Sequence, residues 1–168
     1  EFYSRKLSAN LDRPNSVNIL ALDSNPIRCA RYHCDTHVNT MVKEAAQILS
    51  TTHIAVTGIQ VACKAYNPNN PCVRWVRESI NNYLWLYDLY VALLNEYEFR
   101  KGKSHGSRKH AEALATPPPL PVVARTPFVQ VMPEEFRREC PHEAYRIYVK
   151  AKLTEWEQRT KPVDTRYT

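Results

Sequence analysis

The sequence predicts an all-α protein: a single domain of three principal helices, joined by a long proline-rich strap and ending in irregular termini. Three observations predict this class. Apolar residues recur at helical spacing over three long segments, near 25–52, 71–100 and 141–158. An Asn-Pro pair opens the first two segments, where Asn caps a helix and Pro suits its first turn. Six of the twelve prolines fall within 116–133, which disfavours a helix there.

The first principal helix is expected to run from about 25 to 52. The apolar run before it, 17–22, is either a buried extended segment or one strand. Within the helix, His37 and Glu44 are separated by two helical turns, so both side chains project from the same side. We expect this side to be an exposed flank that faces a groove lined with positive charge. Such a flank would hold an acid or a base rigidly over a substrate.

The remaining elements follow in order along the chain. A second helix over 71–100 has an aromatic-rich stripe, which predicts core packing more than base stacking. A basic loop (101–110) and a short helix (107–115) lead into the strap, 116–133, which we expect to pack across the helices. A helical turn over 133–138 precedes the last helix, 141–158. We therefore divide the chain into an N-terminal extension (1–16), a helical domain (17–160) and a basic C-terminal tail (161–168).

Composition narrows the class of partner and of chemistry. The net charge of +6 and a sequence pI near 9.1 favour a polyanionic partner. The chain has neither a G-x-G-x-x-G motif nor a P-loop, and no apolar run approaches the length that crosses a membrane. We therefore expect no bound cofactor and no membrane partner.

The cysteines indicate free thiols in a reducing, intracellular compartment, because five is an odd count without paired C-x-x-C spacing. Zinc binding by Cys29, His33, Cys34 and His37 is disfavoured, because ligands from one helix cannot surround a tetrahedral ion. We predict no metal site. Cys34 beside His33 is a weak candidate nucleophile, because no orienting base is evident.

Two separated segments carry a resemblance to a known family. The first is Asn-Ile-Leu-Ala-Leu-Asp at 18–23, followed by His-Val-Asn-Thr-Met-Val-Lys-Glu at 37–44. The second, 132–159, contains Pro-x-Glu-Phe-Arg, then Pro-His-Glu-Ala, then a helix with an Ala-Lys-Leu-x-Glu core and a Gln-Arg pair. Together these motifs, in this order, resemble the bacteriophage pyrimidine-dimer DNA glycosylases of the endonuclease V type.

The resemblance implies a glycosylase and abasic-site lyase. In that family an N-terminal α-amine attacks the sugar C1′ and forms an imine, while a helix Glu assists β-elimination. Glu44 matches this catalytic carboxylate, and His37 matches a site His seven residues before it. DNA is the implied partner, with RNA as an alternative. The implied nucleic-acid-binding residues combine the basic neighbour of Glu44, the basic loop and the last helix: Lys43, Lys103, His105, Arg146, Lys150 and Lys152.

Two departures from the family keep alternatives open. Sixteen residues precede Val17, so the α-amine stands where the family places it only if the chain is processed to near Val17. The family's C-terminal aromatic cluster is reduced to Tyr167. One alternative is a catalytically retired homologue that serves as a structural nucleic-acid-binding subunit of an organellar ribosome or a virion. Another is an unrelated small-molecule enzyme that uses His33, His37 and Glu44.

The N-terminal extension itself has three readings: the remainder of a targeting peptide, a cloning remnant, or an arm that binds other protein subunits. The expected cellular location depends on whether the chain is a phage enzyme or an organellar subunit. We expect either the cytoplasm of a phage-infected host or an organelle matrix.

Overall fold

The structure is a computed structural model that describes residues 17–168; the predicted N-terminal extension, 1–16, lies outside the described residues. Every regular element in the described part of the chain is helical, which confirms the all-α prediction. The three long helices are α3 (Asp35–Thr57), α5 (Ile80–Lys101) and α7 (Pro141–Glu157). The short ones are α2 (Pro26–Arg31), α4 (Pro71–Arg77), α6 (Ala111–Leu114) and two 3₁₀ turns, η1 (Gly106–His110) and η2 (Glu134–Phe136).

The predicted helix over 25–52 is in fact two helices, because α2 ends at Arg31 and α3 begins at Asp35. Asn25 caps α2 as expected, accepting from the backbone N–H groups of Ile27 and Arg28. The break follows from a distant side chain. The guanidinium of Arg100 donates to the carbonyls of Arg31 and His33, at 3.1 and 2.7 Å, and so satisfies groups at the end of α2. Sequence periodicity cannot reveal a partner that lies so far along the chain.

The predicted helix over 71–100 is likewise divided into α4 and α5, with the break at Glu78–Ser79. Ser79 caps α5 by accepting from the N–H of Asn81. The side-chain amide of Asn82 donates to the carbonyl of Trp75 at 2.7 Å, which satisfies a group at the end of α4. Because polar side chains serve both helix ends at the junction, the chain turns there at little cost.

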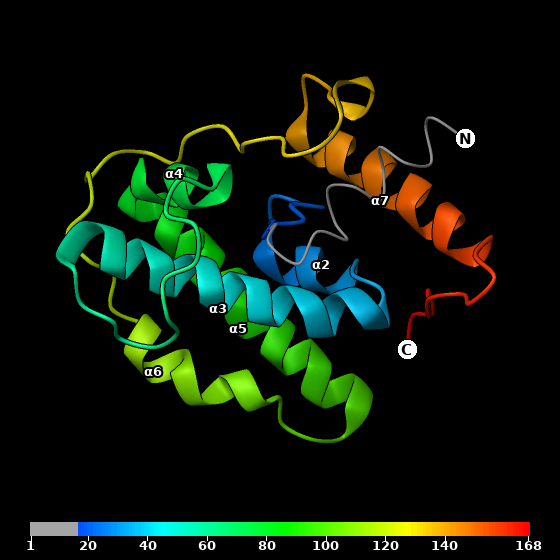
Figure 1. Ribbon diagram of the computed structural model, residues 1–168, viewed down its shortest axis with the longest axis horizontal. Coiled ribbons are helices and arrows are strands. Elements are labelled where there is room, and N and C mark those ends of the chain that lie inside the picture. The colour runs from blue at the N-terminus through cyan, green and yellow to red at the C-terminus, as the bar shows by residue number, and fades with distance from the viewer. Residues whose placement is uncertain (1–16) are drawn as a thin grey trace.

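The core lies between α3 and α5, which cross at the centre of the molecule, with α2 packed on α5 (Figure 1). The segment Val17–Leu22 is buried and forms no strand, and it turns at Ala21, where the Leu22 N–H donates to the Leu20 carbonyl at 2.9 Å. This excludes the strand that the sequence left open. α7 is joined to the same segment, because His142 Nδ1–H donates to the Ala21 carbonyl at 2.7 Å and Arg146 Nε to the Leu22 carbonyl at 2.7 Å.

The strap, 116–133, has no helix and packs across the helices as predicted, running past α4 toward η2 (Figure 1). Its anchor is Phe128, whose ring stacks on Trp75 at 4.8 Å and meets the edge of Trp85 at 4.6 Å. Ser79 Oγ donates to the Val123 carbonyl at 2.6 Å. The strap thereby fixes α4 and α5 relative to the segments that follow it.

The C-terminal tail docks on the start of α3. The Asp35 N–H donates to the Arg166 carbonyl at 2.8 Å, and the Thr36 hydroxyl donates to the Asp164 carbonyl at 2.6 Å. These bonds satisfy groups in the first turn of α3, whose N-cap residue, Cys34, supplies no side-chain bond. Among residues 17–168, no helix is both long enough and apolar enough to cross a membrane.

Candidate functional site

Glu44 lies on α3 where the N-terminal segment passes it. One carboxylate oxygen accepts a hydrogen bond from the backbone N–H of Asn18 at 2.7 Å. The side chain is partly buried, and burial raises the pKa of Glu44 from 4.5 to about 7, although the Asn18 hydrogen bond opposes this rise. A carboxyl group with a pKa near 7 can both donate and accept a proton at neutral pH.

Asn18 holds this arrangement rigid from three directions. Its side-chain amide donates to the Val131 carbonyl of the strap at 3.1 Å. Its side-chain oxygen accepts from the Cys72 thiol of α4 at 3.6 Å. The Tyr145 hydroxyl of α7 lies 3.5 Å from the same oxygen and donates to the Val129 carbonyl at 2.6 Å. The backbone N–H that faces Glu44 is therefore fixed by elements far apart in sequence. Asn18 stands in the Asn-Ile-Leu motif, but sequence reasoning gave it no role at the site.

His37 is almost wholly buried, so the prediction that it shares an exposed flank with Glu44 is wrong. Its ring lies 5.0 Å from the ring of Trp156 on α7, and its Nδ1 has no hydrogen-bond partner within residues 17–168. Burial, with smaller effects of His33 and Lys152, lowers the pKa of His37 to about 3. The imidazole is therefore neutral. Helical spacing correctly placed His37 on a side of the helix but could not show that Trp156 covers it.

The last helix presents only part of its predicted basic surface. Lys152 is fully buried, with its ammonium 5.7 Å from the centre of the Trp156 ring, so it does not meet a phosphate at the protein surface. This corrects its prediction as a nucleic-acid contact. Arg146 and Lys150 are exposed. Arg146 also pairs with Asp23 at 3.1 Å, which holds its guanidinium in place.

The basic loop differs from its prediction in one residue. Lys43 and Lys103 are exposed, as a phosphate contact requires. His105 is buried: its Nδ1 accepts from the Ser107 N–H at 2.9 Å, so its Nε2–H donates to the Asn39 side chain at 2.9 Å. Both ring nitrogens thus serve packing, and His105 caps η1 instead of contacting a ligand.

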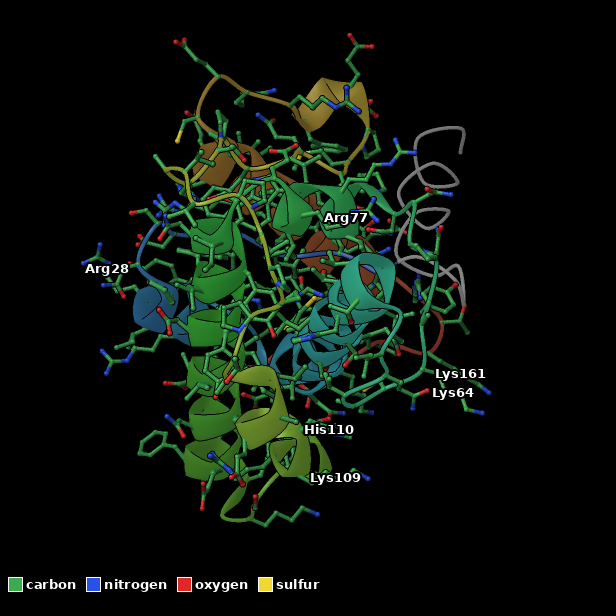
Figure 2. The ribbon with its side chains drawn as sticks, turned by 90° about the vertical axis from the view of Figure 1, so that its left-hand side faces the viewer. Arg28, Lys64, Arg77, Lys109, His110 and Lys161 are labelled. Carbon is green, nitrogen blue, oxygen red and sulfur yellow. The ribbon has the colours of Figure 1, made fainter. Side chains whose placement is uncertain are left out.

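Positive charge is spread over several sides of the molecule. In Figure 2, Arg28 projects at the left, Lys161 at the right and Lys109 at the bottom, and Arg77 lies in the upper half of the view. Three of the cations, Arg31, Arg146 and Lys150, line one cavity between α2, α7 and the tail. Neither His37 nor Glu44 lines this cavity, and the positive groove expected in front of them stays a prediction.

His33, Cys34 and Asp35 form a cluster whose contacts are with other parts of the protein fold. His33 Nδ1–H donates to the Cys29 carbonyl at 2.7 Å, and burial lowers the pKa of this imidazole to about 4. Asp35 pairs with the buried guanidinium of Arg100 at 3.1 Å. Burial raises the pKa of the Cys34 thiol, which makes the thiolate less accessible. Within the described residues, no three His, Cys, Asp or Glu side chains are placed to hold a metal ion.

The five cysteines are all free, and three of them, Cys29, Cys34 and Cys72, are buried. This confirms the free, mostly buried thiols predicted from the odd count.

Comparison of the chain with protein-family models, with curated proteins and with solved structures gave no significant match.

Proposed function

We propose that this protein is a DNA glycosylase and abasic-site lyase that acts on damaged or modified pyrimidines, with Glu44 as its acid–base carboxyl. The observation that carries the proposal is the setting of Glu44. Its carboxyl has a pKa raised to about 7 by burial, and it is held 2.7 Å from a backbone nitrogen of the N-terminal segment. This combination suits a reaction in which protons enter and leave near neutral pH beside a nucleophilic amine.

Each step of the lyase reaction requires a proton to be given or taken. A neutral amine attacks the C1′ aldehyde of an abasic sugar, and the resulting carbinolamine loses water to form an imine. Protonated Glu44 donates the proton that allows the hydroxyl to leave. The ionised carboxylate then removes a C2′ proton, the C3′–O bond breaks by β-elimination, and the phosphate departs with that electron pair. Water finally hydrolyses the imine and restores the amine.

The amine in this proposal is the α-amine of a chain processed to near Val17. Consecutive residues are about 3.8 Å apart, so an amine at Val17 would stand within one residue of the Asn18 nitrogen that touches Glu44. An α-amine has a pKa of about 8, so a useful fraction is unprotonated at neutral pH. A surface lysine, with a pKa of about 10.4, would be almost fully charged.

Borohydride trapping on DNA that contains an abasic site tests the proposal. The test uses the 168-residue chain, a chain that begins at Val17, and two variants of the shorter chain, Glu44→Gln and Glu139→Gln. Glu139 is exposed on the loop before α7 and provides a matched loss of charge. We expect an adduct at the amine of Val17, unchanged in the Glu139→Gln variant and formed about 100-fold more slowly in Glu44→Gln. Equal trapping by both variants, or no trapping by any chain, would refute the lyase.

A second candidate function is that of a catalytically inactive homologue, a structural subunit that binds nucleic acid within a larger assembly. Three of the predicted site residues, His37, His105 and Lys152, are buried in packing contacts, which favours this reading. It predicts no adduct in the trapping experiment, together with duplex binding that weakens steeply as salt rises. Parallel titrations with DNA and RNA duplexes of one sequence would identify the preferred nucleic acid.

A further inference from the structure

A cavity of about 560 Å³ lies between α2, α7 and the C-terminal tail, apart from the carboxyl of Glu44. Its volume falls within the range of small-molecule sites. Three cations line it: Arg31 from the end of α2, and Arg146 and Lys150 from α7. No acidic side chain lines it within residues 17–168. The cavity therefore favours an anionic ligand.

The three cations differ in whether an acidic side chain already pairs with them. Arg31 has Glu96 at 3.8 Å, and Arg146 has Asp23 at 3.1 Å. These contacts orient the two guanidinium groups and offset part of their charge, while the two acids themselves do not line the cavity. Lys150 is exposed, and no acidic side chain of the described residues pairs with its ammonium. Lys150 is thus the cation most available to a phosphate.

The rest of the lining is aromatic and aliphatic. Tyr32 and Tyr167 both line the cavity and are 44% and 54% exposed, so their rings are open to a ligand. The Arg146 guanidinium lies 5.7 Å from the centre of the Tyr32 ring, which places positive charge beside an aromatic face. Val149 and Leu153 of α7 supply apolar surface between them. A flat, partly apolar ring would bury this surface.

We propose that this cavity binds a single nucleotide unit, with its phosphate at Lys150 and Arg146 and its base against Tyr32 and Tyr167. A simple inorganic anion would leave the tyrosines and the aliphatic surface unused. A neutral aromatic compound would make no use of the cations, of which Lys150 has no acidic partner among the described residues. A nucleotide combines an anionic group and a planar base in one molecule, and base stacking on aromatic side chains tolerates any sequence.

The Val17–Leu22 segment connects this cavity to Glu44. Asn18 touches Glu44, and Leu22 lines the cavity, so at most about 14 Å of extended chain separates the two. This upper limit equals the rise of about four nucleotides along a duplex axis. The ligand has two possible sources, a free nucleotide or one nucleotide of a bound strand. The inference does not depend on the lyase chemistry, because ligand binding is measured without any covalent step.

Isothermal titration calorimetry of the full chain tests the inference with four probes: dTMP, thymidine, inorganic phosphate and the single strand (dT)₄. Three variants are compared with the parent: Tyr32→Leu, Lys150→Gln and the control Lys109→Gln. Lys109 is exposed in η1, which does not line the cavity, and it lies at the lower end of the view in Figure 2. All three positions are at the surface, and a circular dichroism spectrum verifies the fold of each variant.

We expect dTMP or (dT)₄ to bind, with affinity lowered about 5- to 100-fold by Tyr32→Leu and about 5-fold by Lys150→Gln, and unchanged in Lys109→Gln. Binding of dTMP identifies a free nucleotide as sufficient. Binding of (dT)₄ alone, with the same response to the variants, assigns the nucleotide to a strand. Three results would each overturn the inference: phosphate binding as tightly as dTMP, thymidine binding as tightly as dTMP, or no effect of either cavity variant. Absence of binding by every probe would overturn it too, and none of these results bears on borohydride trapping.

Discussion

Replacing Glu44 with Gln should stabilise the protein increasingly as pH rises. Burial raises the pKa of this carboxyl from 4.5 in the unfolded chain to about 7 in the folded protein. Below pH 4.5 the carboxyl is protonated in both the folded and the unfolded protein, so its ionisation does not change the free energy of unfolding. Between these values the unfolded chain ionises while the folded protein does not, so stability is lost as pH rises. Above pH 7 the loss is complete.

The size of this effect follows from the two pKa values. At about 1.4 kcal/mol per pKa unit, the rise from 4.5 to about 7 corresponds to about 3 kcal/mol. Glutamine does not titrate, yet its side-chain oxygen can still accept from the Asn18 N–H. The Glu44→Gln variant should therefore gain about 3 kcal/mol relative to the parent between pH of about 4 and about 8.5.

Urea denaturation at several pH values measures this gain as the difference in free energy of unfolding between variant and parent. Other titrating groups cancel in the difference, and Glu139→Gln on the exposed loop is the matched control, for which no such trend is expected. A difference that stays constant with pH would refute the reasoning. So would a loss of stability in the variant at high pH, because it would mean that the fold favours the ionised carboxylate.

Two further predictions concern the residues that frame the site. Replacing Arg100 with Met should lower the free energy of unfolding by about 3–5 kcal/mol, because it leaves the buried carboxylate of Asp35 without its cation and removes the caps on α2. Adding Asp35→Asn should recover part of that loss; a loss under about 1 kcal/mol in urea denaturation would contradict the argument. Replacing Asn18 with Ala should cost about 2 kcal/mol, because the Val131 carbonyl and the Cys72 thiol lose buried partners. Faster amide exchange at residues 19–22 should accompany that loss, and unchanged exchange would show that Asn18 does not hold the segment.

The elements of the fold follow from local signals, whereas their ends depend on distant partners. The Asn-Pro pairs predict the starts of α2 and α4 because capping is local. The two unpredicted breaks are stabilised by Arg100 and by Asn82 with Thr126, which lie up to 69 residues away in sequence. At the second break, Ser79 is a local capping signal for the start of α5, but the apolar stripe continues through it from Val76 to Ile80.

The sequence predicts that His37 and Glu44 lie on the same side of one helix. It does not predict which other parts of the protein cover them. The spacing of His37 and Glu44 fixes their common side of the helix. Which of the two meets solvent is decided by α7, whose Trp156 covers His37 and whose Tyr145 braces Asn18 beside Glu44. The same helix buries Lys152 and exposes Lys150, although both are lysines two residues apart. A clue to this difference is the apolar stripe of α7, because Lys152 follows Tyr145 and Tyr148 by seven and four residues.

We have proposed that Glu44 transfers protons during cleavage at an abasic site. Single-turnover strand cleavage by the chain that begins at Val17, measured across pH with Glu44→Gln and Glu139→Gln, tests it most directly. We expect a rate in the parent and in Glu139→Gln that changes with pH as Glu44 titrates, because burial raises the pKa of its carboxyl. In Glu44→Gln we expect a rate about 100-fold lower, without that pH dependence. Cleavage by Glu44→Gln at the parent rate, with the same pH profile, would contradict it.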